Sequence, residues 1–133
     1  NLAISLHAAD DELRSSMLPI NKQYPIADLL SAVQNYTELT HRRVTFEWAL
    51  IQEVNDTPEQ ALKLAALLRG MLAHVNVIPL NPTDGFKGKA TTPEQAKNFR
   101  SILEERGISC SIRIRRGIDI KAGCGQLAQK LPV

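Results

Sequence analysis

The sequence predicts an α/β protein with a parallel sheet, in the order β-α-β-α-β-α-β. Three observations lead to this prediction: four apolar or β-branched segments of strand length, amphipathic segments of helix length between them, and a repeated helix-start motif. Most strand segments lack strict polar alternation, as is typical of parallel strands that are buried on both faces. With right-handed crossovers, such a chain forms either part of a doubly wound sheet or an arc of a (β/α) barrel. Four strands cannot close a barrel.

The strands are expected at residues 2–6, 44–51, 75–80 and 109–114. Between them, apolar residues recur at helical spacing, and a short additional helix is expected after Asp10. The longer helical patterns consist of Ile26, Leu29, Leu30, Val33 and Tyr36, of Ala61, Leu64, Ala65, Leu68 and Leu72, and of Ala96, Phe99, Ile102 and Leu103, with Gly107 as a stop.

The second and third helical patterns begin with the same residues, Thr-Pro-Glu-Gln-Ala, at 57–61 and 92–96. Each motif favours Thr as the N-cap, Pro at the first helical position and Gln at the third. This is a capping box, in which the Thr and Gln side chains satisfy backbone N–H groups that the helix leaves without partners. The interval of 35 residues between the two motifs is that of a βα unit.

Composition excludes several classes of protein. The chain has 133 residues, about the size of one domain, and 44% hydrophobic with 23% charged residues is typical of a globular protein rather than a disordered, collagen-like or coiled-coil chain. The apolar runs are too short to cross a bilayer, so no membrane association is expected. The aromatic content of 5% argues against a stacking platform for nucleic acid. Two cysteines cannot form a disulfide framework, and they fit a thiol-reducing cytoplasm.

The charge is unevenly distributed along the chain. Residues 1–83 carry a net charge of −3, whereas residues 84–133 carry +5. A basic C-terminal third can attract a polyanion such as RNA, although the same charges can simply keep a surface solvated.

The chain begins inside its first predicted strand, with neither a Met nor the basic and apolar regions of a signal peptide. We therefore expect a piece of a longer protein. Its first strand would then present an exposed edge through which the fragment self-associates.

Ligands bind at the carboxyl ends of parallel strands, which selects segments 5–7, 53–55, 81–82 and the residues from 115 onward. His7 could bind a ligand or act as an acid or base there, or it could only cap a turn. Asn81 offers amide donors and acceptors for a polar ligand, or it could be a turn residue. The acidic run at 10–12 fits a helix N-terminus better than a metal site.

Basic residues gather in the C-terminal third. The segment 83–89 is rich in Gly and Lys but lacks the P-loop pattern, so we interpret it as a mobile basic loop. Arg113 and Arg115 share one strand face, and Arg116 follows. These arginines could hold phosphates, or they could only protect a solvated edge strand with charge.

The two cysteines differ in their surroundings. Cys124 lies between Gly123 and Gly125, where a flexible backbone leaves the thiol approachable for a nucleophilic or redox role. Cys110 lies inside the last predicted strand and is expected to be a small core residue.

Three motifs together resemble the radical-SAM ribosomal-RNA adenine-C2 methyltransferases. They are Ser-Leu-His-Ala at 5–8, Ile-Pro-Leu-Asn-Pro at 78–82 and Arg-Gly-Ile-Asp-Ile-Lys-Ala-Gly-Cys-Gly-Gln-Leu at 116–127. The resemblance covers essentially the whole chain but only the C-terminal part of the family's sequence. Ala9 and Gly123 differ mildly from the family, which usually has Pro and Ala there.

The resemblance implies a partial (β/α)6 barrel that holds a [4Fe–4S] cluster and S-adenosylmethionine. It further implies methylation at C2 of an adenine in 23S ribosomal RNA, and some members also act on transfer RNA. Ser5, Leu6, His7 and Asn81 would bind S-adenosylmethionine. Cys124 would be methylated and then deliver its carbon to the base as a radical, because C2 is electron-poor and does not attack a sulfonium methyl group directly.

Lys87, Lys89, Arg113, Arg115 and Arg116 are expected to contact the RNA. The resemblance places the CxxxCxxC cluster motif, a resolving cysteine and a glutamate base upstream of residue 1, so no metal ligand is expected in this chain and the fragment alone should be inactive. Two alternatives stay open: a stand-alone α/β module that binds RNA or another ligand, and a radical-SAM enzyme that acts on a small molecule. Methylation at C8 rather than C2 also stays open, since related enzymes differ.

Overall fold

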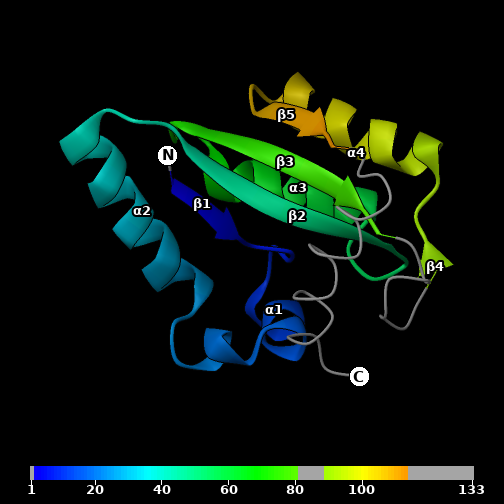
Figure 1. Cartoon of the computed structure of the whole chain (residues 1–133), viewed down its shortest axis with the longest axis horizontal. Helices are drawn as coiled ribbons and strands as arrows, with labels where there is room; N and C mark the ends of the chain where they lie inside the picture. The colour runs from blue at the N-terminus through cyan, green and yellow to red at the C-terminus, as the bar shows by residue number, and fades with distance from the viewer. Residues whose placement is uncertain (1, 81–88, 114–133) are drawn as a thin grey trace, which may run out of the picture.

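The computed structural model describes residues 2–80 and 89–113 (Figure 1). Its elements, in chain order, are β1 (Leu2–Ser5), α1 (Asp11–Met17), the 3₁₀ helix η1 (Pro19–Lys22), α2 (Ile26–Thr40), β2 (Val44–Gln52), α3 (Pro58–Leu68), β3 (Ala73–Pro79), β4 (Lys89–Ala90), α4 (Pro93–Glu105) and β5 (Ser109–Ile112).

Four strands form a parallel sheet in the order β1-β2-β3-β5, which confirms the predicted succession of strands and crossover helices. The short strand β4 was not predicted. It pairs antiparallel with the end of β2, where Ile51 is opposite Ala90 and Gln52 is opposite Lys89. A strand of two residues is too short for a hydrophobic period to reveal it.

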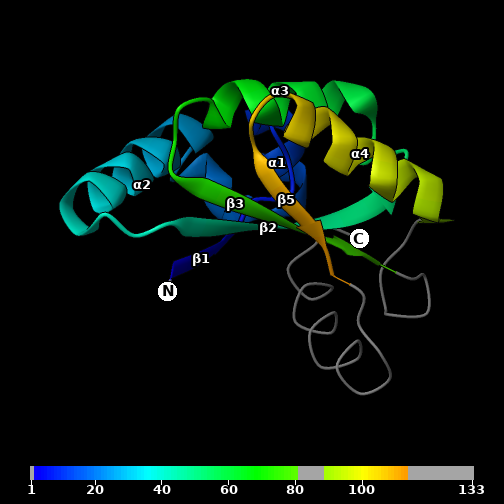
Figure 2. The same ribbon diagram turned by 90° about the horizontal axis from the view of Figure 1, so that it is seen from above.

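The crossover helices α2, α3 and α4 pack against one face of the sheet, and Figure 2 shows α3 and α4 together on that side. Val33, Leu64 and Phe99, one from each helix, share a single core with Phe46 and Trp48 of β2. The Trp48 and Phe99 rings lie 5.4 Å apart between centroids. Sequential strand order with helices on one face is the arrangement of a barrel arc, because a doubly wound sheet reverses its strand order and carries helices on both faces.

A second, smaller core lies near the carboxyl ends of β2 and β3. Ala49 and Ile51 belong to it, whereas Trp48 and Leu50 belong to the main core. Because neighbouring strand residues point to opposite faces, this half of β2 is buried on both sides and shows no polar alternation. Met17 of α1 packs into the second core. Within 2–80 and 89–113, no helix is both long and apolar enough to cross a membrane.

The repeated helix-start motif caps both helices through its threonine. Thr57 Oγ1 accepts a hydrogen bond from the Gln60 N–H (3.2 Å), and Thr92 Oγ1 accepts one from the Gln95 N–H (3.1 Å). The reciprocal half of the predicted capping box is wrong for Gln60. Its side chain accepts from the Ala9 N–H (2.9 Å) and donates to Asp10 Oδ2 (2.8 Å), so it ties α3 to the segment after β1.

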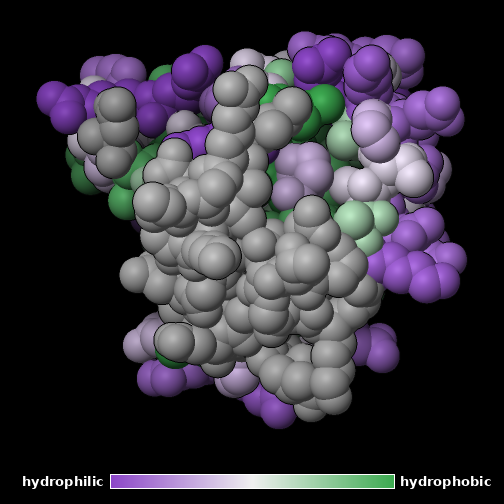
Figure 3. Space-filling view, turned by 45° about the vertical axis from the view of Figure 1, so that its right-hand side comes forward, coloured by the Kyte–Doolittle hydropathy of each residue, from purple (hydrophilic) through white to green (hydrophobic). Residues whose placement is uncertain are grey.

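One predicted helix boundary is also wrong. Helix α3 ends at Leu68, and Gly70 adopts a positive φ of 75°, so Leu72 lies beyond the helix and is 47% exposed. The chain turns there into β3, which begins at Ala73. On the side of the molecule seen in Figure 3, hydrophilic residues cover most of the described surface, with smaller hydrophobic patches between them.

Candidate active site

The sheet face opposite the main core carries a row of polar side chains at mid-sheet, and the second core with Ala49, Ile51 and Ile78 lies beyond this row toward the carboxyl ends of the strands. The pairing register aligns Ser5 with Glu47, Glu47 with Asn76, and Asn76 with Ser111, so one row of polar side chains crosses the described strands. These residues alternate with core residues along each strand and therefore point away from the helices. In a barrel arc this face is the interior, and ligands bind at its carboxyl end.

An ion pair spans this face. Arg113 follows β5, and its Nη1 lies 3.9 Å from Glu47 Oε2. The Arg113 side chain is 56% exposed, and a long, partly exposed pair of this kind contributes little to stability. Both groups are therefore available to a polar or charged ligand at low energetic cost.

His74 lies one row closer to the amino ends of the strands. Its Nδ1 lies 2.6 Å from Ser109 Oγ, and its Nε2 lies 2.9 Å from Ser111 Oγ. Ser111 donates its hydroxyl proton to Asn76 Oδ1 (3.3 Å), so it accepts from His74 Nε2, and Ser109 then donates to Nδ1. Burial lowers the pKa of His74, and the nearby positive charge of Arg43 lowers it further. His74 is thus a neutral link in a hydrogen-bond chain.

The residues after β1 form a tight turn. His7 is buried and adopts a positive φ of 62°, and the Ala8 N–H donates to the Leu6 carbonyl at 2.8 Å. His7 Nδ1 accepts a hydrogen bond from the Ala49 N–H (2.9 Å). A backbone N–H can only donate, so Nδ1 carries no proton and the neutral ring carries its proton on Nε2. At Nε2 the His7 ring is therefore a hydrogen-bond donor and not a base.

The loop after β2 is held by Asp56. Its carboxylate accepts from the Glu53 N–H (3.0 Å) and from Thr91 Oγ1 (2.8 Å). Glu53 has a positive φ of 62°, which the Asp56 contact stabilises. Because Thr91 directly follows β4, this carboxylate fixes Lys89 and Ala90 beside the end of β2.

The described part of the chain contains five of the residues that the sequence singled out for the site. Ser5 lies on the polar face at the end of β1, whereas the Leu6 side chain is fully buried in the main core. His7 follows in the buried turn, where its ring binds the Ala49 N–H. Lys89 is exposed on β4, and Arg113 lies beside Glu47. The remaining predicted site residues lie outside the described residues: Asn81, Lys87, Arg115, Arg116 and Cys124.

Cys110 is a core residue, as predicted. It is 7% exposed and packs in the main core. Burial raises its pKa to about 12, and the Glu104 carboxylate acts in the same direction. A thiol that stays protonated is a poor nucleophile, so Cys110 does not supply reactive sulfur.

The acidic run after β1 has a structural role, as predicted. Asp10 caps α1 by accepting from the Leu13 N–H (2.8 Å), and Asp11 accepts from the Ile26 N–H (2.9 Å) at the start of α2. Among the residues that the structure describes, no three His, Cys, Asp or Glu side chains gather as a metal site. The two cysteines of the sequence are also too few for a [4Fe–4S] cluster held by three thiolates, so this chain's residues do not fit such a cluster.

Three site residues, Glu47, Asn76 and Arg14, were not predicted, and Asn55 was selected only as part of the strand-end segment 53–55. Glu47 and Asn76 interrupt otherwise apolar strands, and a polar residue in a buried strand is the signal that could have identified them. Arg14 and Asn55 are buried and bind backbone carbonyls near His7. Nothing in the local sequence distinguishes Arg14 from a solvated helix residue.

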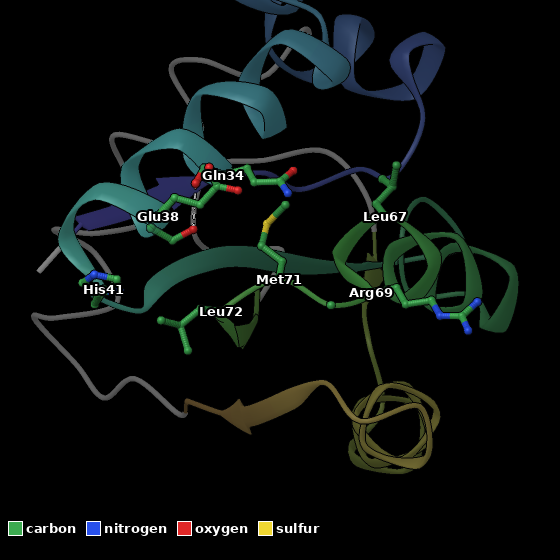
Figure 4. A pocket seen from close by; sticks show the side chains of 9 residues that line it. Gln34, Glu38, His41, Leu67, Arg69, Met71 and Leu72 are labelled. Carbon is green, nitrogen blue, oxygen red and sulfur yellow. Dashed lines mark hydrogen bonds between the residues drawn. The ribbon is translucent and has the colours of Figure 1, made fainter.

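A surface pocket lies at the opposite end of the sheet. It is lined by residues of α2 and of the turn between α3 and β3, among them Gln34, Glu38, Met71 and Leu72 (Figure 4). This is the amino-terminal side of the strands, where conserved chemistry is not expected in barrels, so we assign no ligand to it.

Comparison with known proteins agrees with the fold. No protein-family model matches the chain. A probable dual-specificity RNA methyltransferase RlmN from Parafrankia is 52% identical over 132 residues, which cover 99% of this chain and 34% of that protein. A radical SAM methyltransferase structure from Sphaerobacter thermophilus has 51% identity and a TM-score of 0.89, and the match covers 95% of this chain and 37% of that one.

A domain of a pyruvate-formate lyase-activating enzyme from Bacteroides vulgatus shares the fold with 17% identity and a TM-score of 0.69, over 84% of this chain and 66% of that chain. The arc of parallel strands is therefore that of the radical SAM enzymes. The chain is 51–52% identical to three proteins named as probable dual-specificity RNA methyltransferases RlmN. It spans about a third of the length of the curated relatives it matches.

Proposed function

We propose that the chain is the C-terminal part of a radical SAM methyltransferase that methylates C2 of an adenine in 23S ribosomal RNA, with transfer RNA as a second substrate to be tested. The observation that carries this proposal is the buried turn at residues 6–8, which follows the exposed Ser5 at the carboxyl end of β1, beside the row of polar side chains. The names of the relatives, which specify an RNA methyltransferase, support the substrate class.

Ser5, His7 and Asn81 are the residues that would hold S-adenosylmethionine, which supplies both the methyl group and the radical when it is bound. The described residues fit such a ligand, because the Ser5 hydroxyl and the Glu47–Arg113 pair lie on one face, and the neutral His7 imidazole lies just beyond the end of β1. Leu6 would not contact this ligand through its side chain, which is in the main core.

Cys124 is the proposed carrier of the methyl group. C2 of adenine is electron-poor, so a protein nucleophile that first accepts the methyl group and then delivers the carbon makes the transfer feasible. Cys110 is unsuitable for this role, because burial raises its pKa to about 12. Cys124 is thereby the one candidate carrier in this sequence, which contains two cysteines.

RNA would approach along the basic C-terminal third. Lys89 and Arg113 both lie near the carboxyl ends of the strands, on β4 and directly after β5. With Lys87, Arg115 and Arg116, they would neutralise phosphates around the site and position the target base.

The test uses the full-length protein that contains this chain, with its cluster reconstituted anaerobically. It is incubated with S-adenosylmethionine, a reductant and either 23S ribosomal RNA or transfer RNA, and digested nucleosides are measured by mass spectrometry. We expect 2-methyladenosine. Formation of 8-methyladenosine, or unmodified RNA from an enzyme that cleaves S-adenosylmethionine, would contradict the proposal. Ser5→Ala and His7→Ala should raise the KM for S-adenosylmethionine, whereas Ser101→Ala on the exposed face of α4 should not.

A further inference from the structure

The turn after β1 has an unfavourable backbone. His7 is not a glycine, yet its φ is 62°, and the hydrogen bond from the Ala8 N–H to the Leu6 carbonyl closes a three-residue turn around it. Turns of this geometry are rare and strained. They persist only where surrounding groups hold the backbone, so the neighbours of this turn identify what maintains it.

Arg14 binds the backbone carbonyls of Ser5 and Leu6. Its Nη2 donates to the Ser5 carbonyl (3.0 Å) and its Nε donates to the Leu6 carbonyl (3.1 Å). Its Nη1 donates to Asn21 Oδ1 (2.8 Å), which fixes the plane of the guanidinium. Arg14 is only 5% exposed, and its hydrogen-bond partners in the described part of the chain are uncharged oxygens. Burial of this cation is costly and lowers the pKa of Arg14, and the nearby Asp11 carboxylate acts in the opposite direction.

Asn55 binds the backbone carbonyl of His7. Its Nδ2 donates both to the His7 carbonyl (2.8 Å) and to the Ala49 carbonyl (2.6 Å), and its Oδ1 accepts from the Ile51 N–H (2.8 Å). The side chain is fully buried. Asn55 therefore connects the turn to the end of β2, from which the Ala49 N–H binds the His7 ring.

We propose that Arg14 and Asn55 are positioning residues, which bind the carbonyl oxygens of Ser5, Leu6 and His7 and so aim the Ser5 hydroxyl and the His7 ring at S-adenosylmethionine. This inference rests on the proposed function, which assigns that ligand to the turn. Because the carbonyls of Ser5, Leu6 and His7 are already bound, recognition at this strand end uses side chains rather than main-chain acceptors.

The test uses the full-length enzyme with its cluster reconstituted. Arg14→Lys keeps the positive charge but cannot reproduce the planar set of donors that spans two carbonyls. We expect the Kd for S-adenosylmethionine to rise by about 10- to 100-fold, because a small misplacement of positioning groups has effects of this size. The KM for RNA should stay within about twofold, because the change lies at the S-adenosylmethionine subsite.

Asn21→Ser is a second variant, which removes the contact to Arg14 Nη1 together with the amide's contacts to Asp11 and Ser15 and leaves both carbonyl contacts of Arg14 in place. It should raise the same Kd by a smaller factor. Leu103→Ala is the matched control. Leu103 is fully buried in the main core on α4 and should lower the Tm without changing the affinity for S-adenosylmethionine.

An Arg14→Lys enzyme that loses thermal stability but binds S-adenosylmethionine like the wild type would overturn the positioning role and leave a structural one. If Arg14→Lys does not fold, an unchanged Kd in Asn21→Ser has the same meaning. Failure of the proposed function gives a different result. In that case the wild type does not bind S-adenosylmethionine, or Ser5→Ala and His7→Ala leave its Kd unchanged, and both proposals are overturned.

Discussion

The contrast between the two thiols can be measured directly. Cys110 is buried on β5, and burial raises its pKa to about 12. At pH 8 such a thiol is ionised to roughly one part in 10⁴, whereas an ordinary thiol with a pKa of about 8.5 is about one-quarter ionised. Because the thiolate is the nucleophile, Cys110 in the folded protein should react with iodoacetamide roughly 10³-fold more slowly than in the unfolded chain.

The assay is pulse labelling of the reduced protein, with and without urea, followed by trypsin digestion and mass spectrometry. Cleavage after Lys and Arg places the two cysteines on separate peptides, 107–113 and 122–130, so each rate is read independently. Raising the pH from 8 to 9 should accelerate native labelling of peptide 107–113 about tenfold but that of the unfolded chain only about threefold. Native labelling of this peptide within tenfold of the unfolded rate would refute the reasoning.

Four further predictions follow from the same structure. Above pH ~8.5 the unfolded Cys110 thiol ionises before the folded one, so the free energy of unfolding should fall by up to ~1.4 kcal/mol per pH unit, and Cys110→Ala should remove this component in denaturant titrations. In the full-length enzyme, Cys124→Ala should abolish RNA methylation, whereas Cys110→Ala should retain it and lose ~1 kcal/mol of stability. RNA affinity should fall steeply as the salt concentration rises. Lys89→Ala or Arg113→Ala should reduce the slope of log K against log salt concentration by about one, whereas Arg106→Ala, directly after α4, should leave this slope unchanged. The isolated chain should self-associate through the open edge of β1, and a strict monomer in light scattering would contradict this.

The polar row offers several groups to one ligand. Ser5, Glu47 and Asn76 occupy neighbouring strands at one level, so a ligand on this face meets several polar groups at once. The crossover helices pack on the other face of the sheet.

Much of the fold could be predicted because its signals are local. The apolar runs and helical periods lie within single elements, and the threonine caps act on N–H groups three residues away. Boundaries were less certain: Leu72 continues the helical period in sequence, but the chain has already turned at Gly70.

The candidate site could be predicted only in part. Ser5 and His7 follow from the rule that ligands bind at the ends of parallel strands. Gln60 fits a capping box in sequence, yet its side chain is used by Ala9 and Asp10, about fifty residues earlier in the chain. Local sequence propensity does not reveal partners such as Ala9 and Asp10, which come close to Gln60 only in the folded chain.

The sequence by itself determined the four strands of the parallel sheet, the helices between them, their order and the family resemblance, because hydrophobic period, capping and motif spacing are properties of short segments. Only the tertiary structure decided that the crossover helices share one face, that Glu47 and Asn76 stand in one row with Ser5, and that Arg14 and Asn55 hold the turn at His7. The physical reason is distance along the chain. Asn55 and the His7 carbonyl are 48 residues apart, and their contact exists only once parallel pairing fixes the register of β1 against β2.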